Sequence, residues 1–313
     1  MTPLRLTLAY ALDALAGDPE WFPHPVRIFG AMIRAGERWL RRPARNPAAE
    51  VVAGTVLTGA IVSVAWCSGK PDAGWWQIPL AWTTLATRNL IDEAAAVIRA
   101  LDAGDLPLAR RRLARIVGRD TAHLNPNEIA RAVIETLAES ACDGIVAPLF
   151  WLAAGGLPWA MAYKSINTLD SMIGHREPPY RYFGVTAARL DDAANLLPAR
   201  LTAIAIATSA AIHGQDGGRS LRVWQRDGDK HASPNAGQSE AAMAGALGIQ
   251  LGGTNFYDGE PHHGPILCEE GRAATARDAK AAIKIVATVS GLAFGAAVLV
   301  LARKRRNGAC RHK

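Results

Sequence analysis

The chain has 313 residues, of which 50% are hydrophobic and 20% charged, and its net charge is +7. These averages fit a soluble protein as well as a membrane protein, so composition alone assigns neither class. The four cysteines show no paired spacing, which argues against a disulfide scaffold and against a zinc cluster.

A proline-rich turn follows an apolar N-terminal segment. Residues 4–15 are apolar and lack a convincing cleavage site, so we expect them to be part of the mature protein. The motif GDPEWFPHPV, residues 17–26, then fixes the backbone with three prolines. We predict that this rigid turn presents Asp18 and His24 to a ligand, although a proline-rich surface turn would have the same composition.

Long windows without charge predict membrane-spanning helices. Three of them, residues 51–69, 144–163 and 285–302, reach or approach the ~20 residues that cross a bilayer core. We therefore predict an all-α, polytopic membrane protein with about four or five transmembrane helices in one domain over residues 1–313. The expected spans lie near 51–69, 73–90, 144–163, 196–215 and 285–302. The alternative is a large soluble α-helical enzyme with very apolar core helices.

Basic residues cluster beside these windows. Arg41, Arg42 and Arg45 precede the first one, and the run Arg303–Arg306 follows the last one. Lys and Arg accumulate on the cytoplasmic side of membrane spans, so we expect a cytoplasmic C-terminal end. No RNA-binding motif accompanies the basic charge, and nucleic acid is not an expected partner.

A ladder of acids precedes the 144–163 window. Asn125 or Asn127 can cap a helix on which Glu135, Glu139 and Asp143 follow at i, i+4 and i+8. Three stacked carboxylates repel one another unless a cation or a basic partner lies beside them. Mg²⁺ that bridges carboxylates to a substrate phosphate would fit, and a solvated helix face or pairing with basic neighbours is the alternative.

Two further polar stripes follow that window. Lys164, Asn167 and Asp170 lie at helical spacing, and Asp191 and Asp192 lie on the next predicted helix. Together they supply a cation, an amide and several carboxylates, which can hold a phosphorylated ligand at a membrane surface.

A basic loop precedes a helix of small residues. Lys230 and His231 stand before the turn that contains Asn235, and residues 236–248 are mostly small. Small residues allow close helix packing or close approach of a bulky ligand. Lys230 and His231 could bind a phosphate or a carboxylate, and a solvated loop is the alternative.

These motifs resemble one known family. GDPEWFPHPV, GRDT, ETLAES, DGIVAPLFW, NTLDSM, ARLDDAAN, KHASPNAG, EAAMAGALG and LGGTNFYDG occur in the order found in adenosylcobinamide-phosphate synthases, the CobD/CbiB family. The resemblance runs from about Asp13 to Gly259. The sequence departs from the family pattern at Ser140 and at Gln238-Ser239, and residues 260–282 match poorly.

The resemblance implies an enzyme of late cobalamin assembly. A carbon-nitrogen ligase of this kind joins (R)-1-aminopropan-2-ol, or its O-phosphate, to the free carboxylate of adenosylcobyric acid and gives adenosylcobinamide or its phosphate. ATP is the expected activator, with Mg²⁺, although no Walker motif locates a nucleotide site. The implied partners are the corrinoid, the amino-alcohol phosphate, membrane lipids and other cobalamin-assembly enzymes, with the active site at the cytoplasmic face of the inner membrane.

The motifs give a set of candidate site residues. The candidate catalytic residues are Glu135, Glu139, Asp143, Asp170 and Asp192. The candidate substrate-binding residues are Asp18, His24, Arg119, Asp120, Lys164, Asn167, Lys230, His231 and Asn235. The candidate metal ligands are Glu139, Asp143 and Asp170. Two other functions remain open from the residues alone, namely a membrane prenyl- or phosphotransferase that holds Mg-diphosphate on acidic clusters, and a transporter.

Overall fold

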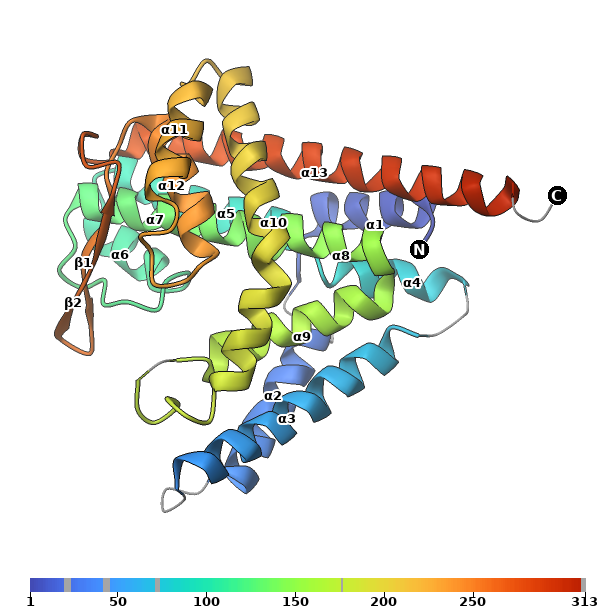
Figure 1. The fold of residues 1–313 in the computed structure, drawn as a ribbon. Helices are drawn as coiled ribbons and strands as arrows, with labels where there is room; N and C mark the ends of the chain where they lie inside the picture. The colour runs from blue at the N-terminus through green and yellow to red at the C-terminus, as the bar shows by residue number, and fades with distance from the viewer. Residues whose placement is uncertain (20–23, 42–45, 71–73, 176, 311–313) are drawn as a thin grey trace. The chain divides into compact units, whose positions relative to one another are not determined.

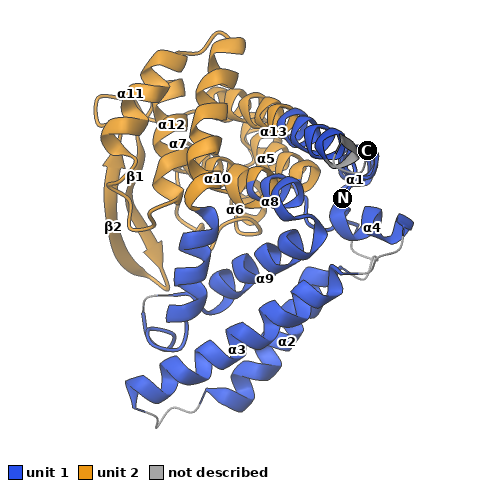
Figure 2. Ribbon diagram, turned by 45° about the vertical axis from the view of Figure 1, so that its right-hand side comes forward, with its two compact units in different colours: residues 1–86, 147–195, 294–313 blue, residues 87–146, 196–293 orange. Residues whose placement is uncertain are grey.

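A computed structural model describes residues 1–19, 24–41, 46–70, 74–175 and 177–310. Within these residues the Cα positions form two compact units (Figures 1 and 2). Unit 1 comprises Met1–Ala86, Ala147–Asn195 and Phe294–Lys313, and unit 2 comprises Thr87–Val146 and Leu196–Ala293. Residues 20–23 of the predicted proline-rich turn, together with Arg42 and Arg45, lie outside the described residues.

Helices make up nearly all of both units. Unit 1 contains α1 (Pro3–Ala16), α2 (Pro25–Leu40), α3 (Pro47–Ser68), η1 (Gly74–Trp76), α4 (Gln77–Trp82), α8 (Ala147–Gly155) and α9 (Leu157–Ile173). Unit 2 contains α5 (Thr87–Asp102), α6 (Leu106–Leu113), α7 (Pro126–Ala141), the π-helical turn η2 (Cys142–Val146), α11 (Gly217–Asp227), α12 (Ala236–Leu247), β1 (Leu251–Tyr257) and β2 (Glu260–Leu267). Both units share α10 (Val185–Ile212) and α13 (Ala276–Cys310).

Four helical segments are long and apolar enough to cross a membrane. They are Pro47–Ser68, Pro126–Gly155, Val185–Ile212 and Ala276–Asn307. Their lengths, from 22 to 32 residues, exceed the ~20 residues that a bilayer core requires. The predicted all-α polytopic architecture is therefore confirmed, with one small hairpin added.

Two predicted spans differ in the structure. The window 73–90 is no single helix, because α4 ends at Trp82 and α5 begins at Thr87. The hydroxyls of Thr83 and Thr84 bond to carbonyls one turn earlier, which closes α4. The window 144–163 is divided at Gly156, whose φ of 78° ends one helix before the next begins.

The core of unit 1 is a set of apolar side chains between α2, α3, α9 and the start of α10. Its buried members are Ile33, Ala53, Leu57, Ile61, Leu169, Ile173, Phe183 and Ala187. Gly54 permits a close approach in this core, because a Cβ there would lie 1.8 Å from the carbonyl oxygen of Phe183. The helix α3 can therefore pack directly on the backbone before α10.

The C-terminal helix also contributes to unit 1. Tyr10 of α1 stacks on Phe294 of α13, with ring centroids 4.2 Å apart. The Lys304 ammonium donates to the carbonyls of Ala153 and Ala154 at 3.0 and 2.7 Å. These carbonyls are among the last of α8 and have no intrahelical donor, so Lys304 caps that helix.

In unit 2 the polar region 214–280 is folded into helices and a hairpin. Its helices α11 and α12 can lie close together because Gly245 has no side chain. A Cβ at this position would come within 2.8 Å of the Arg219 carbonyl oxygen. Ser220 donates to the Ala242 carbonyl at 2.7 Å across the same interface. The strands β1 and β2 pair antiparallel through a turn at Asp258 and Gly259, both of which have positive φ.

Candidate functional site

A buried imidazole lies at the beginning of α2. His24 caps this helix with Nδ1, which accepts from the Val26 amide at 3.2 Å. Its Nε2 therefore carries the proton of the neutral ring and lies 3.6 Å from Asp18. Burial lowers the pKa of His24, Asp18 opposes this, and Lys164 and Arg27 lower it further. The structure thus brings together three of the predicted substrate-binding residues, Asp18, His24 and Lys164.

A chain of polar side chains links α9 to α10. The Tyr163 hydroxyl donates to Asn195 at 2.9 Å, and the Asn195 amide donates to Asp191 at 2.9 Å. The second Asp191 oxygen accepts from Asn167 at 3.5 Å. Asp191 and Asn195 are buried, so these bonds satisfy groups that water cannot reach. Helical spacing predicted polar roles for Asn167 and Asp191, but not the participation of Tyr163.

Two further carboxylates neighbour this chain. Asp170 and Asp192 both act electrostatically on Asp191. A Cβ at Gly174 would lie 1.9 Å from Asp170 Oδ1, so the absence of a side chain at this helix end makes room for the carboxylate. Three acids with amide neighbours in one place suit a cationic group such as an ammonium ion.

A second network in unit 2 centres on Glu135. Arg119 pairs with one of its oxygens, and the Gly252 amide donates to the other at 2.8 Å. Arg131 lies 3.8 Å from Glu135 and donates to Asn255 Oδ1 at 3.0 Å. Arg119 donates to the same Asn255 oxygen at 2.6 Å. The network connects α7 to β1. For Glu135 the structure therefore shows pairing with basic neighbours, which was the alternative to Mg²⁺ binding.

Asp120 holds the same hairpin from its other end. The Asp120 amide donates to the Phe256 carbonyl at 2.8 Å, and its carboxylate accepts from the Gly259 amide at 2.8 Å. The predicted substrate-binding residues Arg119 and Asp120 thus both contact β1 or its turn.

The three acids of the predicted ladder differ in environment. Glu135 is buried, Glu139 is exposed and Asp143 is half-buried in the π-helical turn η2. Asp143 lies inside this turn, where the i, i+4 geometry of an α-helix does not apply. The sequence periodicity could not reveal this turn.

Glu240 is a buried acid that the sequence analysis missed. It is 6% exposed on α12, a helix whose residues are all buried. Burial raises the pKa of Glu240 well above 4.5, and the nearby Glu135 and Glu139 raise it further. The signal available in the sequence was one carboxylate within a run of small residues.

The basic loop before α12 is paired within unit 2. Lys230 lies 2.9 Å from Asp227 and 3.3 Å from Glu269, and the bond with Asp227 raises the pKa of Lys230. His231 Nδ1 accepts from the Ser233 amide at 3.0 Å, and Asn235 is buried at the start of α12. The loop is therefore ordered by its own contacts, and substrate binding by Lys230, His231 and Asn235 stays a prediction.

The predicted metal ligands do not form a cluster of three. Among the residues that the structure describes, no group of three His, Cys, Asp or Glu side chains could hold a metal ion. Glu139 and Asp143 belong to unit 2, whereas Asp170 belongs to unit 1. The metal assignment accordingly stays a prediction.

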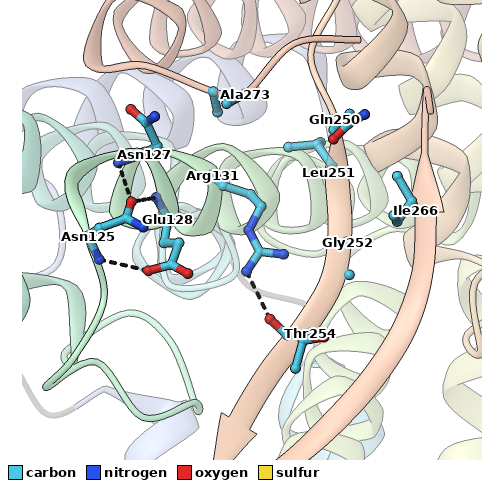
Figure 3. A pocket seen from close by; sticks show the side chains of 12 residues that line it. Asn125, Asn127, Glu128, Arg131, Gln250, Leu251, Gly252, Thr254, Ile266 and Ala273 are labelled. Carbon is cyan, nitrogen blue, oxygen red and sulfur yellow. Dashed lines mark hydrogen bonds between the residues drawn. The ribbon is translucent and has the colours of Figure 1, made fainter. Parts of the chain in front are cut away.

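Each unit also has an open cavity. In unit 2 a cavity of about 410 Å³ lies between the start of α7 and β1, with Glu128, Arg131 and Gly252 on its walls. Figure 3 shows the Arg131 guanidinium reaching across to the Thr254 carbonyl, 3.1 Å away. In unit 1 a cavity of about 440 Å³ lies between the end of α9 and the start of α10.

Comparison with known proteins identifies relatives along almost the whole chain. The CobD/Cbib protein family model matches residues 6–286. Cobalamin biosynthesis protein CobD of Citrobacter koseri is 42% identical over 96% of this chain and 98% of its own. CobD of Geobacter metallireducens is 47% identical over 83% of this chain and 84% of its own. Cobalamin biosynthesis protein CbiB of Salmonella typhimurium is 42% identical over 97% of this chain and 98% of its own. No solved structure matches. The chain therefore belongs to the CobD/CbiB protein family.

Proposed function

We propose that this protein forms the amide bond between an amino alcohol and a corrinoid in cobalamin biosynthesis. The observation that carries the proposal is the identity of 42–47%, over 83–97% of this chain, to relatives named for cobalamin biosynthesis. The substrates are the free carboxylate of adenosylcobyric acid and (R)-1-aminopropan-2-ol or its O-phosphate. The product is adenosylcobinamide or its phosphate.

The reaction requires an activated carboxylate, because an oxide ion is a poor leaving group. ATP transfers a phosphoryl group to the carboxylate and leaves as ADP. The amine nitrogen then attacks the acyl carbon, the C–N bond forms, and the bond from carbon to the phosphate oxygen breaks. Inorganic phosphate departs, and the nitrogen loses a proton to a base.

The carboxylates of unit 1 match the amine in this reaction. An amine enters from neutral water as an ammonium ion, which a cluster of acids attracts, and it must lose a proton before it attacks. We assign the ammonium site to Asp170, Asp191 and Asp192, with the amides of Asn167 and Asn195 orienting Asp191. Positioning of this kind converts a bimolecular step into an effectively unimolecular one.

Mg²⁺ enters this proposal together with the nucleotide. A Mg²⁺ ion keeps several water and phosphate ligands and needs only one or two protein carboxylates, so a protein cluster of three is not required. Bound there, it would neutralise phosphate charge. We assign no residue of this chain to it. The active site is proposed to face the cytoplasm at the inner membrane, where the nucleotide is available.

Mass spectrometry tests the activity directly. The purified protein in lipid nanodiscs would be incubated with adenosylcobyric acid, aminopropanol phosphate and Mg-ATP. The expected product carries the mass of both substrates less one water, and ADP accumulates in equal amount. Consumption of an isoprenoid diphosphate with no change in the corrinoid would favour the prenyltransferase alternative and contradict the proposal.

A further inference from the structure

The unit 1 cavity of about 440 Å³ is lined by several basic groups. His175, Arg181 and Arg189 contribute to its walls, together with Asp192. The two guanidinium groups bring positive charge to the cavity, beside the carboxylate of Asp192. A concave, positively charged surface attracts anions more strongly than the same charges on a convex surface.

The two arginines of this cavity lack an acidic partner. Neither the Arg181 nor the Arg189 side chain forms a hydrogen bond or an ion pair with any part of the chain that the structure describes. The Arg181 guanidinium instead lies 5.6 Å from the centroid of the Tyr182 ring. The side chains of Arg181 and Arg189 are both exposed. Elsewhere the exposed arginines Arg88 and Arg226 pair with acids. The donors of Arg181 and Arg189 remain available to an anionic ligand.

The backbone adds to the positive potential. The helix α10 begins at Val185, which lines the cavity, so the partial positive charge of its N-terminus lies beside the cavity. Gly184 fixes this position, because a Cβ there would lie 1.7 Å from the Ile173 carbonyl oxygen at the end of α9. The beginning of α10 is thereby held against the end of α9.

Acidic groups lie close to these arginines, since Asp192 follows Arg189 by one turn of α10. Asp192 lines the cavity, and Asp170 Oδ1 lies against Gly174, which is also a lining residue. The cavity therefore offers guanidinium groups to one part of a ligand and carboxylates to another. A small molecule with a phosphate and an ammonium group presents the complementary pair of charges.

We propose that this cavity binds the phosphate monoester of the amine substrate, with Arg181 and Arg189 on the phosphate and the ammonium group toward Asp170 and Asp192. Arginine suits this role because its planar fork donates two parallel bonds to a phosphate. The assignment rests on the proposed function.

Calorimetric titration of the full chain in nanodiscs of neutral lipid tests this assignment. Aminopropanol phosphate and aminopropanol would be titrated into the wild type, Arg189→Gln, Arg181→Gln and the control Arg38→Gln, an exposed arginine of α2. We expect each cavity variant to raise the Kd of the phosphate ester about ten- to a hundredfold, the loss of one charge-assisted hydrogen bond. The Kd of aminopropanol should change less than about threefold, and the control should match the wild type.

Three results would overturn the assignment. One is an unchanged Kd for the ester in both cavity variants. Another is an equal loss for the ester and for aminopropanol, which would indicate a general structural effect. The third is an unchanged Kd for the ester combined with weaker binding to vesicles that contain phosphatidylglycerol, which would assign the cavity to a lipid phosphodiester. Binding is measured without turnover. Absence of ligase activity in the wild type would therefore refute the proposed function but not the assignment of the cavity.

Discussion

At the scale of single residues, the acids of this protein divide into two kinds. Glu135 is buried and fully bonded, by two guanidinium groups and a backbone amide. Asp170, by contrast, lies at a helix end beside a cavity and near other carboxylates. Removing the charge of each should therefore have different consequences.

Glu135→Gln should lower stability. The substitution leaves the partly buried guanidinium groups of Arg119 and Arg131 without their carboxylate, which should cost less than the ~3–5 kcal/mol of a fully buried pair. Thermal unfolding in detergent would show a lower Tm for Glu135→Gln, whereas the exposed control Glu269→Gln should unfold like the wild type. Equal Tm values for both variants would mean that this network does not stabilise unit 2.

Asp170→Asn should lower activity and leave folding intact. The amide keeps the size of the side chain but removes the charge that would hold the ammonium group, so we expect specific activity to fall at least about a hundredfold. The measurement is activity per folded protein across a Mg²⁺ titration, with Glu139→Gln in parallel. Full activity of Asp170→Asn at every Mg²⁺ concentration would exclude both a metal-binding and an ammonium-binding role.

Glu240 should make stability depend on pH. Its pKa is raised in the folded protein above 4.5, its ordinary value, so the folded state binds more protons than the unfolded state in this range. The free energy of unfolding should therefore fall as pH rises above about 4.5. Glu240→Gln removes this dependence, so its Tm relative to wild type should be higher at pH 8 than at pH 5. A constant difference between these pH values would show that Glu240 titrates normally.

At the scale of helices, the positions of glycines decide how closely α3 packs. A Cβ at Gly54 would collide with the Phe183 carbonyl, whereas Gly59 on the same helix has no atom within 4 Å of such a Cβ. Gly54→Ala should lower the Tm. Gly59→Ala should raise it slightly, because Ala is favoured over Gly in helices by about 1 kcal/mol. Equal effects of the two substitutions would mean that α3 does not pack closely at Gly54.

Some helix ends could be predicted from the sequence, and others could not. Local signals sufficed where one residue determines the end, as at Asn125, which caps α7 through a capping box with Glu128. The window 144–163 was predicted as one span, and absence of charge reports environment and not helix continuity. The residues Gly155-Gly156-Leu157-Pro158 within it are a sequence signal for a kink, and the positive φ of Gly156 divides the window there. The hairpin β1–β2 was missed because its anchors, Arg119 and Asp120, lie far away in sequence.

The candidate site shows the same division. Helical spacing predicted that Lys164, Asn167 and Asp170 share a helix, and α9 contains all three, because helix membership is a local property. The hydrogen bond from Tyr163 to Asn195 and the burial of Glu240 depend on packing between distant segments. Spacing within a single helix contains no information about such contacts.

At the scale of the whole molecule, the four apolar helices imply firm membrane attachment. The protein should remain in the pellet after alkaline carbonate extraction, and recovery in the supernatant would contradict a membrane-spanning fold. If all four helices cross, both ends of the chain lie on one side, since the number of crossings is even. Reporter fusions after Lys304 and within α1 should then give the same signal, and fusions at Ala103 and Gly217 the opposite one.

The contribution of α13 to unit 1 has a consequence for biogenesis. Residues 1–86 and 147–195 emerge from the ribosome long before residues 294–307, yet Phe294 stacks on Tyr10 and Lys304 caps α8. Until then the carbonyls of Ala153 and Ala154 lack that donor, and the ring of Tyr10 lacks its neighbour. Unit 1 therefore completes its packing only after translation has passed residue 304, and a nascent chain stalled before that point would be a substrate for membrane proteases.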